Sequence, residues 1–492
     1  MLPDELSKDN RDCLEPQVVY FRVMYRKVSS ASNEGASSLV PMLVLDALRK
    51  MPGTRRYRIA YSGGMDSHAL LHVVARSRDA LGEAEVSAIH INHGLQANAN
   101  EWAEHAWLVC RDLDVPCEIL MIDARPESGE SPEAAARRAR YGAIKAIMEK
   151  DEILLTAHHL DDQAETLLMQ MVRGAGPHGL AGMPTLARFG MGWLGRPLLG
   201  IAREALRDYA LSQGLCWIED ESNDDTRFAR NYLRHEILPR LRARWPSVAV
   251  TLGRAALHQA QAAEQLDRLA KEDLARLYGS ADDVLSCERL RRLPDYRQRN
   301  ALHRWFRDLG LPVPNAAHME RILRDVVDAG SDRTPLIRWS GAEVRRYRDE
   351  LYAGSPLPTW NPTQSICWRL TERLSLPHGT IEALRTHGAG LRVASCPDDR
   401  VEVGFRRGGE RCRIGANGCT HRLKKLFQES GIRPWERDRI PLIFIEGELA
   451  AVAGLWVCHP FEASGDEPGW IFRWSPSYRY PPFNQSRHSV NR

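Results

Sequence analysis

The sequence lacks the patterns that mark membrane-spanning, secreted and zinc-binding proteins. No apolar run approaches the roughly 18 residues of a transmembrane helix, and the N-terminus has no basic segment followed by a long apolar one. We therefore predict neither a membrane span nor a signal peptide. The ten cysteines form no C-x-x-C pair, which argues against a zinc ribbon and against a disulfide framework. A reduced, cytoplasmic setting is the simpler interpretation.

An excess of charge of one sign is also missing. The formal net charge of the 492 residues is only +3, so no uniformly basic surface predicts a nucleic-acid partner, although local patches can still bind one. An apolar fraction of 43% and a charged fraction of 27% are ordinary for a globular protein. The length exceeds what one hydrophobic core supports, so we expect two to four domains.

One glycine-rich turn joins a strand-like segment at 57–61 to an amphipathic helix that starts near Asp66. The turn reads Ser62-Gly63-Gly64-Met65-Asp66-Ser67, and all six residues are candidates for binding a nucleotide. The N–H groups of a first helical turn bind anions, and glycines let the backbone approach a phosphate. No Gly-Lys-Ser/Thr follows, so the turn is not a Walker loop. The alternative is an ordinary strand–helix turn.

A repeated strand–helix rhythm follows this turn. Strand-like segments lie at 57–61, 86–91, 117–122 and 153–157, and each precedes a helical pattern. The later three helices are expected at about 99–112, 132–148 and 162–172. Such units predict an α/β fold, a Rossmann-like parallel sheet with helices on both faces. Ligands of these sheets bind at the carboxyl ends of the strands.

Polar residues follow two of these strands at the expected ligand edge. Residues 90–95 follow the second strand, and the fourth is followed by a cluster that holds His158, His159, Asp161 and Asp162. This cluster can ligate a metal, or Asp161 or Asp162 can cap the next helix, and its spacing matches no zinc pattern. Asp66 and Asp162 suit Mg²⁺ beside a polyphosphate, and they equally suit an amine-bearing substrate.

Two groups of basic residues are candidates for phosphate contact. Arg137 and Arg140 share one helix face, and residues 404–439 hold ten Lys/Arg against four Asp/Glu. Within that second group, 418–428 is predicted to be a basic helix that is capped by Thr420 and ended by Gly431. The alternative for both groups is a solvated basic surface.

Changes in composition and pattern divide the chain into five parts. They are a weakly ordered extension at 1–50, a catalytic nucleotide-binding domain at 51–240, a helical middle domain at 241–360, a basic mixed α+β domain at 361–475 and a disordered tail at 476–492.

The turn at 62–67 matches the S-G-G-x-D-S loop (PP-loop) of the N-type ATP pyrophosphatases, and further motifs narrow the resemblance. From about Arg55 to about Trp474 the sequence resembles the tRNA(Ile)-lysidine synthetases of the longer, three-domain type. The motifs that carry the resemblance lie at 90–95, 137–141, 158–166, 173–176, 196–198, 220–223, 230–234, 424–429 and 434–438. The loop alone is shared widely, whereas the ordered set is specific. The N-terminal extension departs from the family's pattern.

The resemblance implies a two-step ligation on the wobble cytidine of the isoleucine tRNA with a CAU anticodon. The loop holds the β- and γ-phosphates of ATP, and the C2 oxygen of cytosine is adenylated with release of pyrophosphate. The ε-amine of L-lysine then attacks C2 and expels AMP. The product, lysidine, changes the codon from AUG to AUA and the amino acid from methionine to isoleucine.

The resemblance also implies roles for particular residues. Asp66 and Asp162 are the candidates for orienting the lysine ammonium and accepting its proton, and Asp66 is the candidate Mg²⁺ ligand. The sequence does not separate these two roles. The residues assigned to tRNA or substrate binding are Arg137, Arg140, Arg173, Arg230, Asn231, Arg234, Lys424 and Lys425. Neither the oligomeric state nor the orientation of the tRNA is predicted.

Three other functions remain open at this point. A tRNA-thiolating enzyme uses the same activation, but Cys110 and Cys117 are too far apart in the sequence to form the C-x-x-C pair that cytidine-thiolating members carry. A glutamine-dependent amidating ligase needs an ammonia source, and no candidate cysteine motif is present. A non-catalytic RNA-binding protein on the same scaffold is disfavoured by the intact loop and by Asp162.

Overall fold

The computed structural model describes residues 33–92, 94, 98–123, 125, 132–330, 333–358, 365–416 and 418–477. The chain forms two compact units, Met1–Gln265 and Leu266–Arg492. Among the described residues, no helix combines the length and the apolar character that crossing a bilayer requires.

The first unit is built on a six-stranded sheet with the order β3-β2-β1-β4-β6-β5. Five strands are parallel, and the edge strand β5 runs antiparallel to β6. The strands are β1 (Arg56–Ala60), β2 (Glu85–Asn92), β3 (Cys117–Met121), β4 (Ile153–Leu155), β5 (Leu186–Phe189) and β6 (Gly192–Gly195). The predicted parallel sheet is confirmed, and β5 and β6 extend it beyond the four predicted strands.

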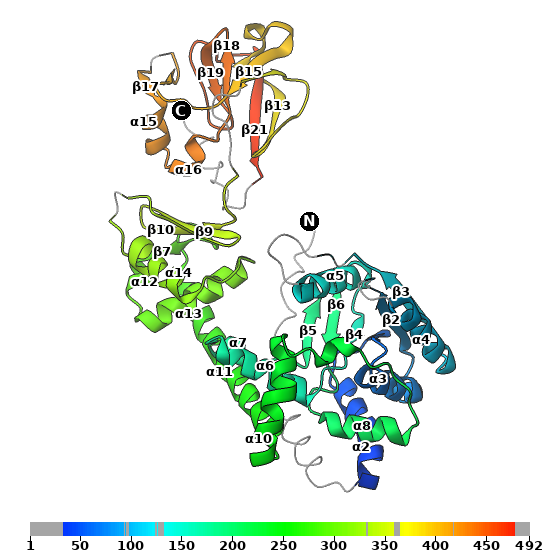
Figure 1. The fold of residues 1–492 in the computed structure, drawn as a ribbon. Coiled ribbons are helices and arrows are strands. Elements are labelled where there is room, and N and C mark those ends of the chain that lie inside the picture. The colour runs from blue at the N-terminus through cyan, green and yellow to red at the C-terminus, as the bar shows by residue number, and fades with distance from the viewer. Residues whose placement is uncertain are drawn as a thin grey trace. The chain divides into compact units, whose positions relative to one another are not determined.

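Helices cover both faces of this sheet (Figure 1). They include α3 (Met65–Arg76), α4 (Ala99–Asp112), α5 (Pro132–Ile147), α6 (Leu160–Val172) and α8 (Arg203–Ser212). Side chains alternate along a strand, so Ile153 and Leu155 of β4 enter the core under α3 and α8, whereas Leu154 enters the core under α5. A strand buried on both faces must be apolar throughout, as β4 is.

The N-terminal segment departs from expectation. Helix α2 (Asn33–Arg49) packs on α3 and α8, and its Leu43, Val44, Ala47 and Leu48 are almost fully buried. The prediction of a weakly ordered extension over 1–50 is therefore wrong for 39–50, which belongs to the sheet domain. Burial of an apolar stripe with helical spacing explains the order, whereas residues 1–32 lie outside the described residues.

The first part of the second unit combines helices with a small sheet. Helix α11 (Val248–Leu277) enters it, and α12 (Cys287–Arg291), α13 (Asp295–Asp308) and α14 (Ala316–Arg321) follow. Strands β7 (Leu285–Ser286), β8 (Leu336–Trp339), β9 (Ala342–Tyr347) and β10 (Glu350–Gly354) form an antiparallel sheet with the order β7-β10-β9-β8. Trp305 and Phe306 of α13 are buried in the core between these helices and the sheet. The predicted helical middle region therefore also carries strands.

The last part of the second unit is a mixed domain of two larger sheets, a β-ribbon and two short helices. One sheet has the order β11-β15-β18-β19-β20 and the other β12-β13-β21-β14, and a two-stranded ribbon joins β16 to β17. The first sheet contains β11 (Ile366–Arg369), β15 (Arg400–Gly404), β18 (Leu442–Ile445), β19 (Glu448–Val452) and β20 (Trp456–Val457). The second contains β12 (Leu374–Leu376), β13 (Gly379–His387), β14 (Leu391–Arg392) and β21 (Pro468–Pro476), and the ribbon consists of β16 (Arg411–Arg413) and β17 (Thr420–Arg422). Helices α15 (Leu423–Glu429) and α16 (Pro434–Arg437) complete the domain, which confirms its mixed α+β class.

Two boundaries differ from those predicted at this end of the chain. Thr420 does not cap the basic helix but pairs with Arg413 in the ribbon, and Arg422 occupies the N-cap of α15. Gly431 follows the helix end in a left-handed conformation (φ +71°), as predicted. Strand β21 continues to Pro476, and the remaining tail from 478 lies outside the described residues.

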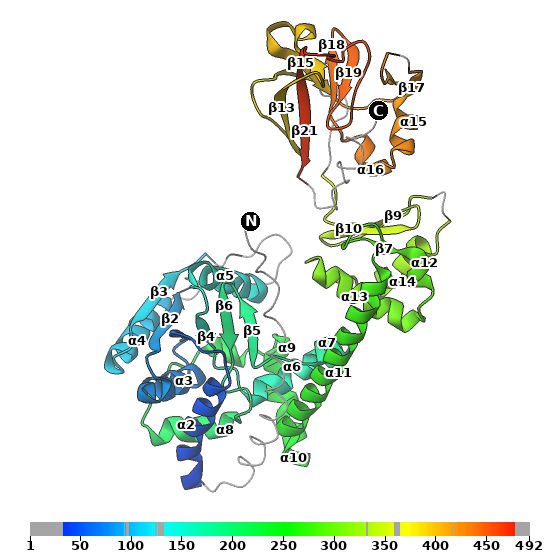
Figure 2. The same ribbon diagram turned by 180° about the vertical axis from the view of Figure 1, so that it is seen from behind.

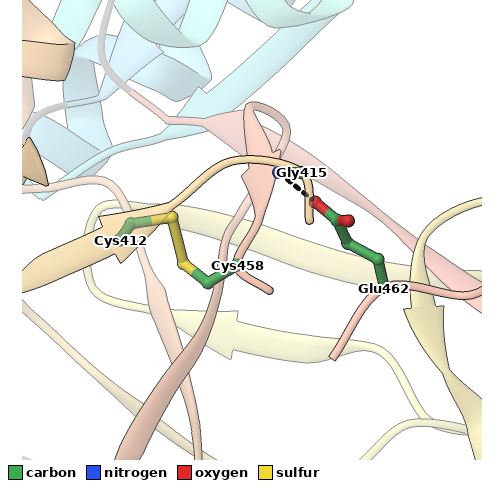
Figure 3. Close-up of a disulfide and its surroundings, with 4 residues drawn as sticks. All are labelled: Cys412, Gly415, Cys458 and Glu462. Atoms are coloured by element: carbon green, nitrogen blue, oxygen red, sulfur yellow. Dashed lines mark hydrogen bonds between the residues drawn. A yellow bond between two sulfur atoms is a disulfide. The ribbon is translucent and has the colours of Figure 1, made fainter. Parts of the chain in front are cut away.

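A disulfide joins Cys412 of β16 to Cys458, which follows β20 (Figure 3). Both cysteines are almost fully buried, and they pack in one cluster with Leu423 and Phe427 of α15. The bond therefore ties the ribbon that precedes the basic helix to the sheet behind it. The prediction against a disulfide framework was wrong for this pair, because cysteines 46 residues apart carry no local signal of their pairing.

Candidate active site

The turn after β1 closes on itself through Ser67. The Ser67 hydroxyl donates to the carbonyl of Gly64 (2.9 Å), accepts from the N–H of Ser62 (3.2 Å), and lies 3.0 Å from the Ser62 hydroxyl. The buried Ser67 side chain thus shapes the loop. The N–H groups of the first turn of α3 have no partners within the helix and point out of its end. Such a set of N–H donors at the carboxyl end of β1 suits an anionic ligand.

Gly63 is required at its position by conformation and by space. Its φ of +86° lies in the left-handed region, and its carbonyl accepts a hydrogen bond from the N–H of Ile218 (3.0 Å). A Cβ at this position would lie 3.0 Å from Ile218 Cδ1. The segment around Ile218 therefore packs directly against the loop, a contact that the sequence did not reveal.

His159 links the two candidate carboxylates, one from each strand end. It caps α6: its Nδ1 accepts from the N–H of Asp162 (3.3 Å), and Asp162 Oδ2 accepts from the N–H of His159 (2.9 Å). Because Nδ1 is an acceptor, the neutral ring carries its proton on Nε2. This Nε2 lies 3.6 Å from Asp66 Oδ2 and 3.4 Å from Asp162 Oδ2. The predicted helix cap and the predicted pair of carboxylates are therefore parts of one site.

Asp162 and Glu165 on α6 are held by two arginines (Figure 2 shows α6 and α9 side by side). The arginines lie one turn apart, Arg230 in α9 (Ala229–Tyr232) and Arg234 in η3 (Leu233–Ile237). Each donates to Asp162 Oδ1, at 2.9 and 3.0 Å, and each donates through Nε to Glu165 at 2.7 Å. Glu165 is almost fully buried, so this network fixes α9 against α6.

The network sets the protonation state of Asp162. Burial alone raises the pKa of a carboxyl group, but the charge of His159 when its ring is protonated and the permanent charge of Arg230 outweigh burial and hold the pKa of Asp162 at about 2. The two guanidinium pKa values are raised by the same carboxylates against the opposing effect of burial. Asp162 is therefore ionised throughout the physiological range.

Asp66 differs from Asp162 in having one carboxylate oxygen that accepts no hydrogen bond in the described part of the chain. Among the described residues none donates a hydrogen bond to Asp66 Oδ1, a buried atom, and the Arg203 Nε lies 3.7 Å away. Asp162 Oδ1 is occupied by two arginines, whereas its Oδ2 accepts one N–H and keeps a further acceptor site. No group of three metal-ligating side chains occurs among the described residues. A metal held by Asp66 would need phosphate or water oxygens for its other ligands.

His158 lies next to this network, and the charges of several arginines act on it. Burial is the main cause that lowers its pKa to about 4, and the charges of Arg196, Arg230 and Arg137 lower it further against the effect of Asp162. The ring is therefore neutral at pH 7, with Nδ1 2.9 Å from the Thr156 hydroxyl. Several arginines around a neutral imidazole suit a polyanionic ligand.

The other predicted substrate-binding residues lie in different places. Arg137 is exposed on α5, with its guanidinium over the ring of Tyr141, and Arg140 is exposed on the same helix. Arg173 is exposed at the C-cap of α6, and the side-chain amide of Asn231 donates to the carbonyl of Asp225. Lys424 and Lys425 are exposed on α15 in the second unit, where Lys425 pairs with Glu429.

Three residues of the site escaped the sequence-based assignment. Glu165 was part of a quoted motif but received no role, although its spacing of three from Asp162 places both on one helix face. Arg196 follows β6, a strand that was not predicted, and its Nη1 donates to the carbonyl of Pro184 (2.7 Å). Arg203 begins α8, and its N–H donates to Asp161 (2.8 Å). Glu165 and Arg196 both lay in motifs that carry the resemblance, at 158–166 and 196–198, whereas Arg203 lay in none.

Comparison with known proteins decides the family. A PP-loop domain model matches residues 42–241, a TilS substrate binding domain model matches 285–352, and a TilS substrate C-terminal domain model matches 401–474. A tRNA(Ile)-lysidine synthase of Coxiella burnetii is 41% identical over 432 residues, which are 87% of this chain and 95% of that protein. The chain belongs to the tRNA(Ile)-lysidine synthase family. A Methylococcus capsulatus member is 42% identical over 88% of this chain and all of its own length.

Family membership does not favour the thiolation alternative. The structure does bring the side chains of Cys110 and Cys117 into hydrogen-bond contact, so their separation in the sequence was a poor guide to their distance. Cys110 is fully buried, and Cys117 lies on β3, with β2 between it and the loop strand β1. This pair is not exposed in the way that a catalytic sulfur carrier requires.

Proposed function

We propose that this chain joins L-lysine to C2 of the wobble cytidine in the isoleucine tRNA with a CAU anticodon, at the expense of ATP. The observation that carries the proposal is the joint placement of the anion-binding turn and two carboxylates around His159. A nucleotide held by the turn and an amine held by the carboxylates would meet at one sheet edge. Since tRNA and ATP are the substrates, the reaction takes place in the cytoplasm.

In the first step the turn binds the β- and γ-phosphates through the N–H groups at the end of α3. The α-phosphorus then stays open to the cytosine C2 oxygen, and pyrophosphate leaves. The open Asp66 Oδ1 fits one coordination position of Mg²⁺, which would neutralise phosphate charge. Arg137 and Arg196, whose charges both act on His158, would stabilise charge on the phosphates.

In the second step the lysine amine replaces AMP on C2. The amine has an ordinary pKa near 10.4, so it arrives protonated and must lose a proton before it attacks. Asp162 Oδ2, with its remaining acceptor site, receives the ammonium, while Asp66 Oδ2 lies across His159 Nε2 and can accept the proton. His159 itself is a donor at Nε2, because its Nδ1 is committed to the helix cap. Its role is to position both carboxylates.

The tRNA is held by basic residues outside this centre. Arg140 and Arg173 are exposed in the first unit, and Lys424 and Lys425 present the charge of α15 in the second. Such phosphate contacts position an RNA without reading its sequence. The identity of the target base is therefore left to the catalytic pocket.

The test is incorporation of labelled L-lysine into an isoleucine tRNA transcript with cytidine at the wobble position. We expect ATP-dependent incorporation, with AMP and pyrophosphate as products, and none into a transcript that carries uridine there. The proposal would be refuted by a preparation that catalyses normal ATP–pyrophosphate exchange with another substrate but incorporates no lysine into this transcript.

A further inference from the structure

Two aromatic side chains lie exposed on α9, the helix whose Arg230 binds the α6 carboxylates Asp162 and Glu165. Phe228 is the N-cap of α9 and is 38% exposed, and Tyr232 at the end of α9 is 48% exposed. The N–H of Tyr232 donates to the carbonyl of Phe228 (2.9 Å), which places both side chains one helical turn apart on one face. Large aromatic side chains normally bury their rings in a core or an interface.

The opposite face of the same helical segment reaches into the active site. Arg230 and Arg234 alternate with the two aromatics at spacings of two residues, and both donate to Asp162 and Glu165. This segment therefore has one face on the candidate catalytic carboxylates and an aromatic outer face beside them.

The aromatic pair lies between an acidic and a basic segment, because residues 219–225 hold five Asp/Glu, one of which, Asp225, pairs with Arg227. Residues 227–244 contain six arginines and a single acidic residue, Glu236. Three of the arginines are turned toward the carboxylates of α6, and the side chains of Arg227 and Arg240 are 89% and 79% exposed. Exposed aromatic rings among arginines are the combination that binds unpaired nucleotides, because rings stack on bases while arginines neutralise phosphates.

We propose that Phe228 and Tyr232 form a stacking platform for the unpaired anticodon-loop bases next to the target cytidine. The inference rests on the proposed function, since it assumes a tRNA whose wobble base enters the pocket beside Asp162. Stacking of the neighbouring bases holds the loop open, so that the target base reaches the pocket already separated from its neighbours. The platform acts on binding and positioning, whereas the carboxylates act on the chemistry.

The expected signature is a rise in KM for tRNA without an equal fall in kcat. Loss of one base–aromatic stack corresponds to roughly a 5- to 150-fold loss of affinity. We expect Tyr232→Leu and Phe228→Leu each to raise KM for tRNA about tenfold, and Tyr232→Phe to stay within about twofold of the wild type. The matched control is Trp107→Leu, because Trp107 on α4 has the same exposed fraction as Tyr232, 48%, and no contact with the site described above.

A direct probe is an RNA hairpin of the anticodon stem and loop that carries 2-aminopurine beside the target cytidine. Stacking on an aromatic ring quenches this fluorophore, so its signal should fall on binding to wild type, Tyr232→Phe and Trp107→Leu, and should fall far less with Tyr232→Leu. Circular dichroism and ATP binding, unchanged in all variants, show that the fold is intact.

Three outcomes would overturn the platform. One is an unchanged KM in both leucine variants, and another is an equal loss in Trp107→Leu. The third is a change of oligomeric state in sedimentation without a change in RNA affinity, which would make the aromatic face a contact between copies of the chain. Failure of the wild type to incorporate lysine would instead refute the proposed function, so the two failures are distinguishable.

Discussion

Replacing Asp162 with asparagine separates the charge of this residue from its role as a helix cap. An asparagine amide oxygen can still accept the N–H of His159, so the start of α6 is kept. The negative charge that Arg230 and Arg234 share is lost, although Glu165 continues to bind both. Asp162→Asn is therefore a milder change than Asp162→Ala, which also removes the cap.

The pKa of Asp162 gives the size of the expected destabilisation. It lies at about 2 in the folded protein instead of 3.8, which corresponds to about 2 kcal/mol of folding free energy. Because the folded pKa is lowered, this contribution is present at pH 7 and is lost as pH falls from about 4 through about 2. We expect Asp162→Asn to unfold with a free energy lower by about 2 kcal/mol.

The assay compares stability with lysine incorporation and uses Asp273→Asn as the matched control. Asp273 on α11 is equally buried and forms a two-point ion pair with Arg297, but it lies outside the catalytic unit. Both variants should lose stability in urea unfolding. At a temperature where both are folded, only Asp162→Asn should lose product formation, by about a hundredfold or more, while its tRNA affinity stays nearly intact.

Two results would contradict this reasoning. Incorporation by Asp162→Asn within about threefold of the wild type would mean that the carboxylate takes no part in handling lysine. A comparable loss in Asp273→Asn would mean that instability, and not chemistry, causes the defect.

Three further predictions address the loop, the disulfide and a buried histidine. Gly63→Ala should weaken ATP binding about tenfold in calorimetric titration, whereas Gly82→Ala, also at positive φ but with open space around it, should cost stability alone, about 1 kcal/mol. Cys412→Ser should lower the stability of the C-terminal domain by up to about 4 kcal/mol from loop entropy; equal unfolding midpoints with and without a dithiol reductant in the wild type would contradict this. The pKa of His378 is lowered to about 4, chiefly by burial, so its contribution is complete above pH 6.5 and is lost as pH falls toward 4. His378→Gln should therefore flatten the pH dependence of unfolding in that window by about 3 kcal/mol, and an unchanged slope would show that this histidine does not titrate there.

The sequence was a good guide where local rules and tertiary packing agree. The strand–turn–helix around Gly63 could be read directly, because a positive φ and an open helix end follow from glycine and from helix geometry. Asp162 accepts an N–H bond at the start of α6, as one of the two alternatives for this cluster anticipated, but the N-cap itself is His159, which was not predicted. The helix predicted to start at Thr420 failed because pairing of β17 with β16 outweighed the capping tendency of threonine.

Local sequence patterns could not predict the roles of residues whose partners lie far away in the sequence. The buried pairing of Glu165 with Arg230 and Arg234 joins segments 65 and 69 residues apart. The strand β6 that places Arg196 is short and has glycine at both ends, so it carries little strand propensity. Helix α2 has an apolar helical stripe, but the small residues 35–38 within its first turns concealed where the helix begins.

By itself, the sequence determined the features that predict the chemistry: a turn suited to binding phosphate, carboxylates at neighbouring strand ends and a parallel sheet that brings those ends to one edge. These follow from residue type, spacing and the geometry of strand–helix units. Only the tertiary structure decided how the carboxylates differ. Asp66 keeps an open oxygen, whereas Asp162 is ionised and held by two arginines from a later helix. The physical reason is that the pKa of a buried carboxylate and the number of its unoccupied hydrogen-bond acceptor positions depend on its neighbours in space. The order of residues along the chain does not specify those neighbours.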